Sequence, residues 1–215
     1  MKIGIIGSGI VAQQLGLGFL RLGHEVQLGT RNQGKLSEWR KQAGAKAIVG
    51  ALEDAARFGE MIVLATKWDN GATENAITLA GKDHFTGKIV IDVTNPLTFG
   101  AEGQPPKLPI GYPHSAGKMI QDWLPQSKVV KAFNIINANY MANPVLKEGI
   151  PDMFIAGNDL TAKNRVKEVA KAWGCEVHDI GDIGQSYLLE ALAFLWITYG
   201  FINHHWNHAF KLLKQ

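Results

Sequence analysis

The sequence is poor in several features that would define a class of protein. It has one cysteine among 215 residues, so it cannot form an internal disulfide. Its 22 basic and 19 acidic residues are spread without a basic run, which argues against nucleic acid as a partner. The N-terminus lacks the layout of a signal peptide, and the longest apolar run, 188–202, is shorter than the ~20 residues that span a bilayer. We therefore expect a cytoplasmic protein without a membrane span.

The sequence also lacks a recognisable motif for hydrolysis or metal binding. It contains no HExxH motif, and no residue stands out as catalytic. His204 and His208 would share one face of an amphipathic terminal helix that also carries Trp206 and Phe210. No third ligand accompanies them, so we expect structural histidines and no metal site. Cys175 is likewise expected to pack in the core.

Short apolar runs alternate with helical patterns from the first residue onward. The expected strands are Lys2–Gly7, Glu25–Thr30, Lys46–Val49, Met61–Ala65, Lys88–Val93, Val129–Phe133, Met153–Ala156 and Glu176–Ile180. Most are continuously apolar, as is typical of parallel strands that helices cover on both faces. The pattern predicts an α/β, Rossmann-type, doubly wound and mostly parallel sheet in one domain, 1–215. A small C-terminal helical extension is expected over 184–215, where the run 188–202 forms a helix that is buried or lies at a subunit interface.

A glycine-rich turn follows the first expected strand. Residues 7–12 read Gly-Ser-Gly-Ile-Val-Ala, in which Gly7 permits a tight turn and Gly9 lets the backbone approach a pyrophosphate. Ala12 allows the next helix to pack closely on the strand. The N-terminus of that helix presents free N–H groups and a positive dipole end to an anion. The residues expected to bind a dinucleotide here are Gly7, Ser8, Gly9, Ile10 and Val11.

The end of the second expected strand indicates which dinucleotide is bound. NAD-binding proteins usually carry an acidic residue there, which accepts a hydrogen bond from the ribose 2′-hydroxyl. This sequence has Thr30, Arg31 and Asn32 instead, with Lys35 one turn later. The arginine can pair with a 2′-phosphate through its planar fork. We predict NADP(H) as the cofactor, with a solvated basic start of a helix as the alternative.

Two further loops follow strands whose carboxyl ends should border the cofactor. Ala65, Thr66 and Lys67 come after the fourth expected strand, and Asn95 and Pro96 come after the fifth. Ligands of open α/β sheets bind at this edge, so we expect these loops to contact the ribose and nicotinamide. For Asn95 and Pro96, a plain turn remains the alternative.

Four segments together resemble a known family. They are Gly-Ser-Gly at 7–9, Gly-Thr-Arg-Asn at 29–32, Asp-Val-Thr-Asn-Pro-Leu at 92–97 and Val-Lys-Ala-Phe-Asn at 130–134. The chain resembles the NADP-dependent reductases of the deazaflavin coenzyme F420, and the related cytosolic reductase domain of six-transmembrane metalloreductases. The resemblance implies NADPH at the glycine turn, hydride exchange with a deazaflavin or flavin beside Asn95 and Asn134, and a homodimer. Ile135 and Ile136 depart from the small hydroxyl residues expected at their positions.

The resemblance predicts an oxidoreductase that passes a hydride between NADP(H) and a small redox acceptor. Hydride transfer between stacked rings requires positioning rather than acid–base groups. A carbonyl-reducing enzyme would need a proton donor, for which Lys131, within a strand, and His114, at the start of a helix, are the available side chains. The alternatives are an NADPH-binding sensor without turnover and a small dehydrogenase or imine reductase. The direction of flux and the acceptor remain open.

Overall fold

The computed structural model describes residues 1–100 and 104–215. Its strands are β1 Lys2–Ile6, β2 Glu25–Gly29, β3 Ala47–Gly50, β4 Met61–Leu64, β5 Ile89–Asp92, β6 Lys128–Lys131, β7 Asp152–Gly157 and β8 Glu176–Asp179. Its helices are α1 Ile10–Arg21, α2 Ser37–Ala43, α3 Leu52–Phe58, α4 Ala72–Ala80, α5 Ala116–Trp123, α6 Ala138–Met141, α7 Leu160–Ala172 and α8 Ser186–Asn203. Each predicted strand is present.

The strands form one sheet in the order β3-β2-β1-β4-β5-β6-β7-β8. All neighbouring pairs are parallel except β6 and β7, which are antiparallel. This confirms the mostly parallel sheet predicted from the apolar runs. The sixth strand ends at Lys131 rather than Phe133, because Phe133 has a φ of 59°, a left-handed conformation that leaves the sheet.

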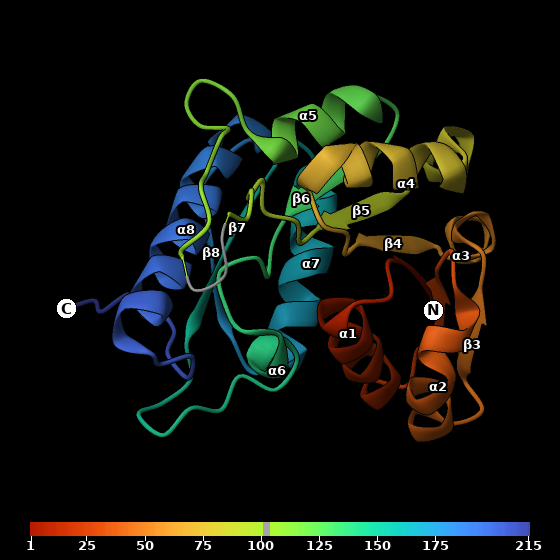
Figure 1. The fold of residues 1–215 in the computed structure, drawn as a ribbon, viewed down its shortest axis with the longest axis horizontal. Helices are drawn as coiled ribbons and strands as arrows, with labels where there is room; N and C mark the ends of the chain where they lie inside the picture. The colour runs from red at the N-terminus through yellow and green to blue at the C-terminus, as the bar shows by residue number, and fades with distance from the viewer. Residues whose placement is uncertain (101–103) are drawn as a thin grey trace.

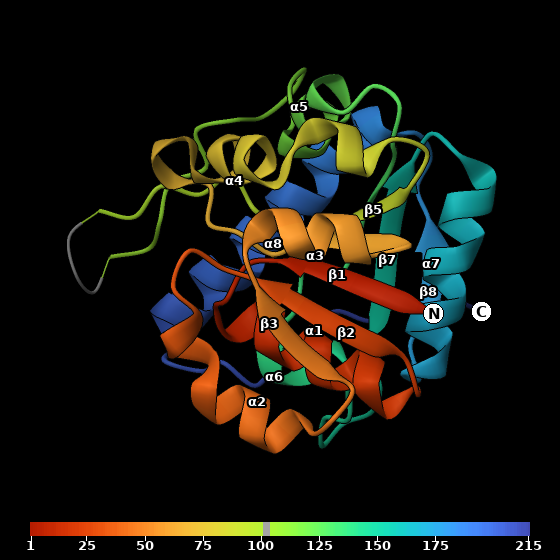
Figure 2. The ribbon, with the colours of Figure 1, turned by 90° about the vertical axis from the view of Figure 1, so that its right-hand side faces the viewer.

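Helices cover both faces of the sheet, as a doubly wound fold requires. One apolar cluster contains Leu15 and Phe19 from α1 and Val166 from α7. A second cluster contains Ile77 from α4 and Ile120 from α5. Figure 2 shows α3 and α4 on one side of the sheet and α1 and α2 on the other. The predicted double winding is confirmed.

The C-terminal region departs from the expected terminal helix. The apolar run forms α8, at the opposite side of the molecule from α2 and β3 (Figure 1), but the helix ends at Asn203. His204 has a left-handed φ of 49°, and the chain then turns back so that the Trp196 indole donates a hydrogen bond to the His208 carbonyl at 2.8 Å. The predicted terminal helix over His204 and His208 is therefore wrong. No helix in the two described ranges is long and apolar enough to cross a membrane.

A buried carboxylate holds this returning segment against the sheet. Asp152, at the start of β7, accepts hydrogen bonds from the Lys211 ammonium and the His178 ring, both at 2.9 Å. Burial alone would raise the pKa of Asp152, but these hydrogen bonds outweigh it and hold the pKa below its usual value. Glu176 lies close enough to Asp152 and His178 for the three to share a metal ion, yet it already pairs with Lys214. The ion pairs with Lys211 and Lys214 thus explain why these charged side chains lie together: they attach the C-terminal segment to the sheet.

Candidate functional site

The glycine turn joins β1 to α1 at the carboxyl edge of the sheet, where it was predicted. Gly7 has a φ of +141°, and a Cβ on it would lie 2.3 Å from the carbonyl oxygen of Ala65. Gly7 is therefore required by the close approach of the loop after β4. A Cβ on Gly9 would meet nothing within 4 Å. The second glycine thus borders open space, as it should where a ligand approaches the backbone.

The N-terminus of α1 opens onto that space. The first N–H groups of any α-helix have no partner within the helix. Gly9 is the N-cap of α1 and supplies no side-chain hydrogen bond to them, and the Ile10 side chain is exposed beside it. The Gln13 amide donates to the Ser8 carbonyl at 3.0 Å, which fixes the turn from within. The arrangement offers unsatisfied N–H donors and a positive dipole end, which fit the phosphates of a dinucleotide.

The end of β2 carries positive charge and no acid. Arg31 and Lys35 are exposed, and neither forms an ion pair with any residue of the described ranges. The hydroxyl of Thr30 accepts a hydrogen bond from the Asn32 amide at 3.2 Å, so this threonine shapes the turn. These residues suit a 2′-phosphate better than a 2′-hydroxyl, because the exposed side chains include two cations and no carboxylate.

The loop after β4 is fixed by the helix that follows it. The Ala65 amide donates to the Ile6 carbonyl at 2.9 Å, which holds the start of the loop beside the glycine turn. The hydroxyls of Thr66 and Thr73 lie 2.9 Å apart, and Thr73 also donates to the Lys67 carbonyl. Thr73 is buried in the first turn of α4, and the sequence analysis did not identify it. It holds Thr66 and Lys67 in place at the carboxyl edge of the sheet.

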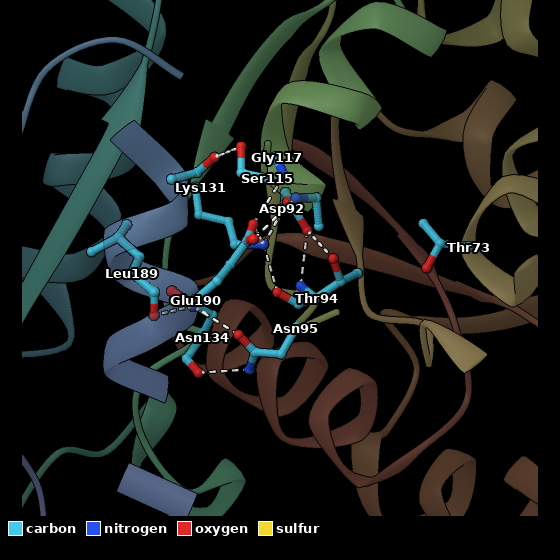
Figure 3. A network of polar contacts seen from close by, with 12 residues as sticks. Thr73, Asp92, Thr94, Asn95, Ser115, Gly117, Lys131, Asn134, Leu189 and Glu190 are labelled. Carbon is cyan, nitrogen blue, oxygen red and sulfur yellow. Dashed lines mark hydrogen bonds and ion pairs between the residues drawn. The ribbon is translucent and has the colours of Figure 1, made fainter. Parts of the chain in front are cut away.

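The loops after β5 and β6 are joined by a pair of asparagines (Figure 3). The Asn95 amide donates to the Asn134 carbonyl, and the Asn134 amide donates to the Asn95 side-chain oxygen, both at 2.9 Å. Asn134 also donates to the Leu189 carbonyl of α8 at 3.0 Å. The left-handed conformation of Phe133 turns the chain so that Asn134 faces Asn95. The direction of the Asn95 amide is thus set by Asn134 and not by Pro96 alone.

A buried lysine lies beneath this pair. The Lys131 side chain is fully buried, and its ammonium lies 2.9 Å from Asp92, 2.6 Å from the Thr94 carbonyl oxygen and 3.1 Å from Glu190. Burial by itself lowers the pKa of Lys131, but the attraction and hydrogen bonds of both carboxylates prevail and raise it above its usual value. Lys131 therefore remains a cation without access to a substrate, which removes it as a proton donor.

Glu190 connects this lysine to α5. Its two carboxylate oxygens accept hydrogen bonds from the Ala116 and Gly117 amides, each at 3.0 Å. The sequence analysis did not assign Glu190 a role, although a lone charge within the apolar run 188–202 signals a buried partner. Helix α5 begins at Ala116 with Ser115 as its N-cap, so His114 lies before the helix and is exposed. The predicted helix start at His114 is therefore wrong.

Three other residues from the sequence analysis belong to the core. Ile135 and Ile136 are 2% and 5% exposed and pack in the apolar cluster that contains α1. These two residues, which depart from the expected pattern, therefore serve the packing of the core. Cys175 is also buried, and burial raises the pKa of its thiol to about 11. A thiol with this pKa is protonated and inert at neutral pH.

Comparisons with known proteins agree with this geometry. The family model for coenzyme F420-dependent NADP oxidoreductases matches residues 2–96, which include the glycine turn and the loop at Asn95. The F420-dependent NADP reductase of Methanocaldococcus jannaschii is 32% identical over 211 residues, which are 92% of this chain and 91% of that protein. Metalloreductase STEAP3 of Rattus norvegicus is 30% identical over 195 residues, 89% of this chain, but the chain spans only 36% of that protein.

A solved structure extends the likeness to the whole fold. A crystal structure from Arthrobacter sp. FB24, provisionally assigned as an F420-dependent NADP-reductase, superposes with a TM-score of 0.92 at 34% identity, with 100% of both chains covered. The resemblance that the four sequence segments indicated is thereby confirmed. The chain belongs to the family of coenzyme F420-dependent NADP oxidoreductases.

Proposed function

We propose that the chain binds NADPH across the glycine turn and passes its hydride to a deazaflavin, a flavin or a similar small redox acceptor. The observation that carries the proposal is the uncapped N-terminus of α1, which opens beside Gly9 onto free space. Exposed Arg31 and Lys35 at the end of β2 supply the charge for a 2′-phosphate. Bound NADPH supplies the hydride, and the named relatives from M. jannaschii and Arthrobacter support a deazaflavin as acceptor.

Each element of the site has a role in this proposal. The turn at 7–11 binds the pyrophosphate, the loop at 65–67 borders the ribose, and Asn95, Pro96 and Asn134 border the nicotinamide and the acceptor. Transfer between two stacked rings requires the donor carbon and the acceptor atom to be held roughly 3–3.5 Å apart in a site that excludes water. The fixed loops after β4, β5 and β6 provide such positioning, and the transfer needs no proton from Lys131.

We propose that 1–215 acts as one NADP-binding unit, because α8 itself supplies Glu190 and the Leu189 carbonyl to the site. The buried thiol of Cys175 suits the reducing cytoplasm that we propose as its location.

The proposal predicts NADPH oxidation by the purified protein. Deazaflavin F420, flavin mononucleotide and a ferric chelate are added separately, and the NADPH absorbance is followed in each. We expect the absorbance to fall with one of the ring-shaped acceptors and to stay constant without protein. Tight NADPH binding with no turnover on any acceptor would contradict hydride transfer and support an NADPH sensor. An absence of NADPH binding would contradict the cofactor assignment.

We also propose that two copies of the chain associate through α8. One side of this helix presents Leu188, Leu195 and Ile202, spaced seven residues apart and 46%, 56% and 69% exposed. Ala191 and Tyr199 lie on the same face, so the stripe carries no charge. An uncharged apolar stripe is complementary to itself across a two-fold axis, and its burial removes apolar surface from water.

Substitution of Leu195 tests this association. We expect Leu195→Glu to shift the protein from dimer to monomer in sedimentation velocity, because a dimer would bury two carboxylates against apolar side chains. Leu79 on α4 is also 56% exposed, so Leu79→Glu is a matched control that should leave the dimer unchanged. A wild-type protein that sediments as a monomer at micromolar concentration would refute the proposal.

A further inference from the structure

Two separate contacts hold the loop after β5 against β6 and α8. One is the amide pair of Asn95 and Asn134, at the surface of the site. The other is the buried ion cluster of Lys131, Asp92 and Glu190 beneath it. We propose that Lys131 is a positioning residue, which sets the place of Asn95 and α8 relative to the nicotinamide and so governs the rate of hydride transfer. This inference rests on the function proposed above.

The contacts of Lys131 reach three elements that border the site. Its ammonium binds Asp92 at the end of β5, the Thr94 carbonyl in the following loop and Glu190 in α8. Asp92 in turn accepts hydrogen bonds from the Thr94 amide at 2.8 Å and the Thr94 hydroxyl at 2.7 Å. Thr94 is thereby held by three bonds immediately before Asn95. A shift of the lysine would move the loop that carries Asn95.

The position of the cluster argues for a role beyond stability. Buried ion pairs add little stability compared with apolar side chains of the same volume, because the charges lose their hydration. Here two carboxylates surround one lysine, and the remaining negative charge faces the Ala116 and Gly117 amides at the start of α5. The opposite end of β6 has no such buried cluster around its lysine, since Lys128 pairs with Asp159 at 3.2 Å on the surface. Of the two lysines in β6, the fully buried one, Lys131, therefore lies at the carboxyl end of the strand, beside the site.

The link to the rate is geometric. A displacement of about 1 Å between reacting groups can slow a reaction by on the order of 100-fold. The phosphates and adenosine bind at the turn 7–11 and at Arg31, on the far side of β4 from Lys131. Loss of the cluster should therefore impair hydride transfer while leaving most of the binding energy of NADPH intact. This division separates a positioning role from a general loss of structure.

The test compares hydride transfer with cofactor affinity in isosteric variants. Asp92→Asn and Glu190→Gln keep the shape of each side chain and remove its charge, and Lys131→Met removes the cation. We expect single-turnover oxidation of 4-deuterated NADPH by the acceptor that the wild-type protein reduces to slow by about 10- to 100-fold with an increased isotope effect. The Kd for NADPH, measured by fluorescence, should change by less than about threefold, which corresponds to about 0.7 kcal/mol. Lys128→Met is the matched control and should alter neither quantity.

The outcomes separate this inference from the proposed function. Unchanged hydride transfer in a folded variant, or an equal loss of transfer and NADPH affinity, would overturn the positioning role. Failure of all three variants to fold by circular dichroism would also overturn it, since the cluster would then serve stability alone. A wild-type protein that oxidises no NADPH with any acceptor would contradict the proposed function instead. Because the wild-type protein is assayed first, a failure of the proposed function is detected before any variant is compared.

Discussion

Replacement of Arg31 by aspartate is expected to reverse the cofactor preference. The variant should bind NADPH about 30- to 1,000-fold more weakly, since a charge-assisted bond to phosphate contributes about 1.5–3 kcal/mol and the new carboxylate repels the 2′-phosphate. NADH binding should be unchanged or improved, because aspartate can accept a hydrogen bond from the ribose 2′-hydroxyl. Arg31 is exposed and forms no ion pair with the described residues, so its removal should leave stability within about 0.5 kcal/mol.

Calorimetric titration with both nucleotides measures this reversal. Lys82→Asp is the control, because it makes the same change in net charge at an exposed position. Lys82 precedes β5 in the chain, whereas the proposed site lies after the carboxyl ends of the strands. We expect this control to bind both nucleotides like the wild type. Equal losses of NADPH and NADH affinity in Arg31→Asp would contradict the assignment of a 2′-phosphate site at the end of β2.

Alanine at the two glycines of the turn should separate stability from binding. Gly7→Ala should lower the free energy of unfolding by about 3 kcal/mol or more, since it combines backbone strain of roughly 1–3 kcal/mol with overpacking of similar size. Its Cβ would lie 2.3 Å from a backbone oxygen, that of Ala65, which cannot move without β4. Gly9 has a φ of −75°, which any residue adopts, and its Cβ would meet nothing. Gly9→Ala should therefore change stability by less than about 0.5 kcal/mol.

Gly9→Ala, which should leave stability almost unchanged, should instead weaken NADPH binding. In Gly9→Ala the methyl group enters the space where the backbone approaches the pyrophosphate, and we expect a loss of about 10- to 100-fold, which corresponds to about 1–3 kcal/mol of steric cost. Urea denaturation measures the stability of each variant, and calorimetric titration measures the affinity. An NADPH affinity that Gly9→Ala leaves unchanged would show that the cofactor does not cross this turn.

Local patterns were sufficient to predict the strands of the sheet and the glycine turn after β1. A parallel strand that helices cover on both faces must be apolar throughout, so β1 and β4 could be recognised without knowledge of their neighbours. Asp159 is the N-cap of α7, and its side chain accepts a hydrogen bond from the Ala162 amide at 2.7 Å, a contact typical of aspartate at the start of a helix. The charge at Arg31 was recognisable because its distance from the glycine turn places it at the end of β2. Each of these features depends on residues close together in the chain.

The interior of the site and the C-terminus depended instead on contacts between distant segments. Asp92, Lys131 and Glu190 come from three elements, and no local pattern indicates that an isolated charge in each will meet the others at 2.9 and 3.1 Å. The path after Asn203 likewise depends on the attraction of Asp152, far back in the sequence, for Lys211. Hydrophobic periodicity and turn chemistry act within a few residues, so the order of residues alone indicated the strands and the glycine turn. Electrostatic partners are chosen by proximity in space, and only the folded chain brought them together.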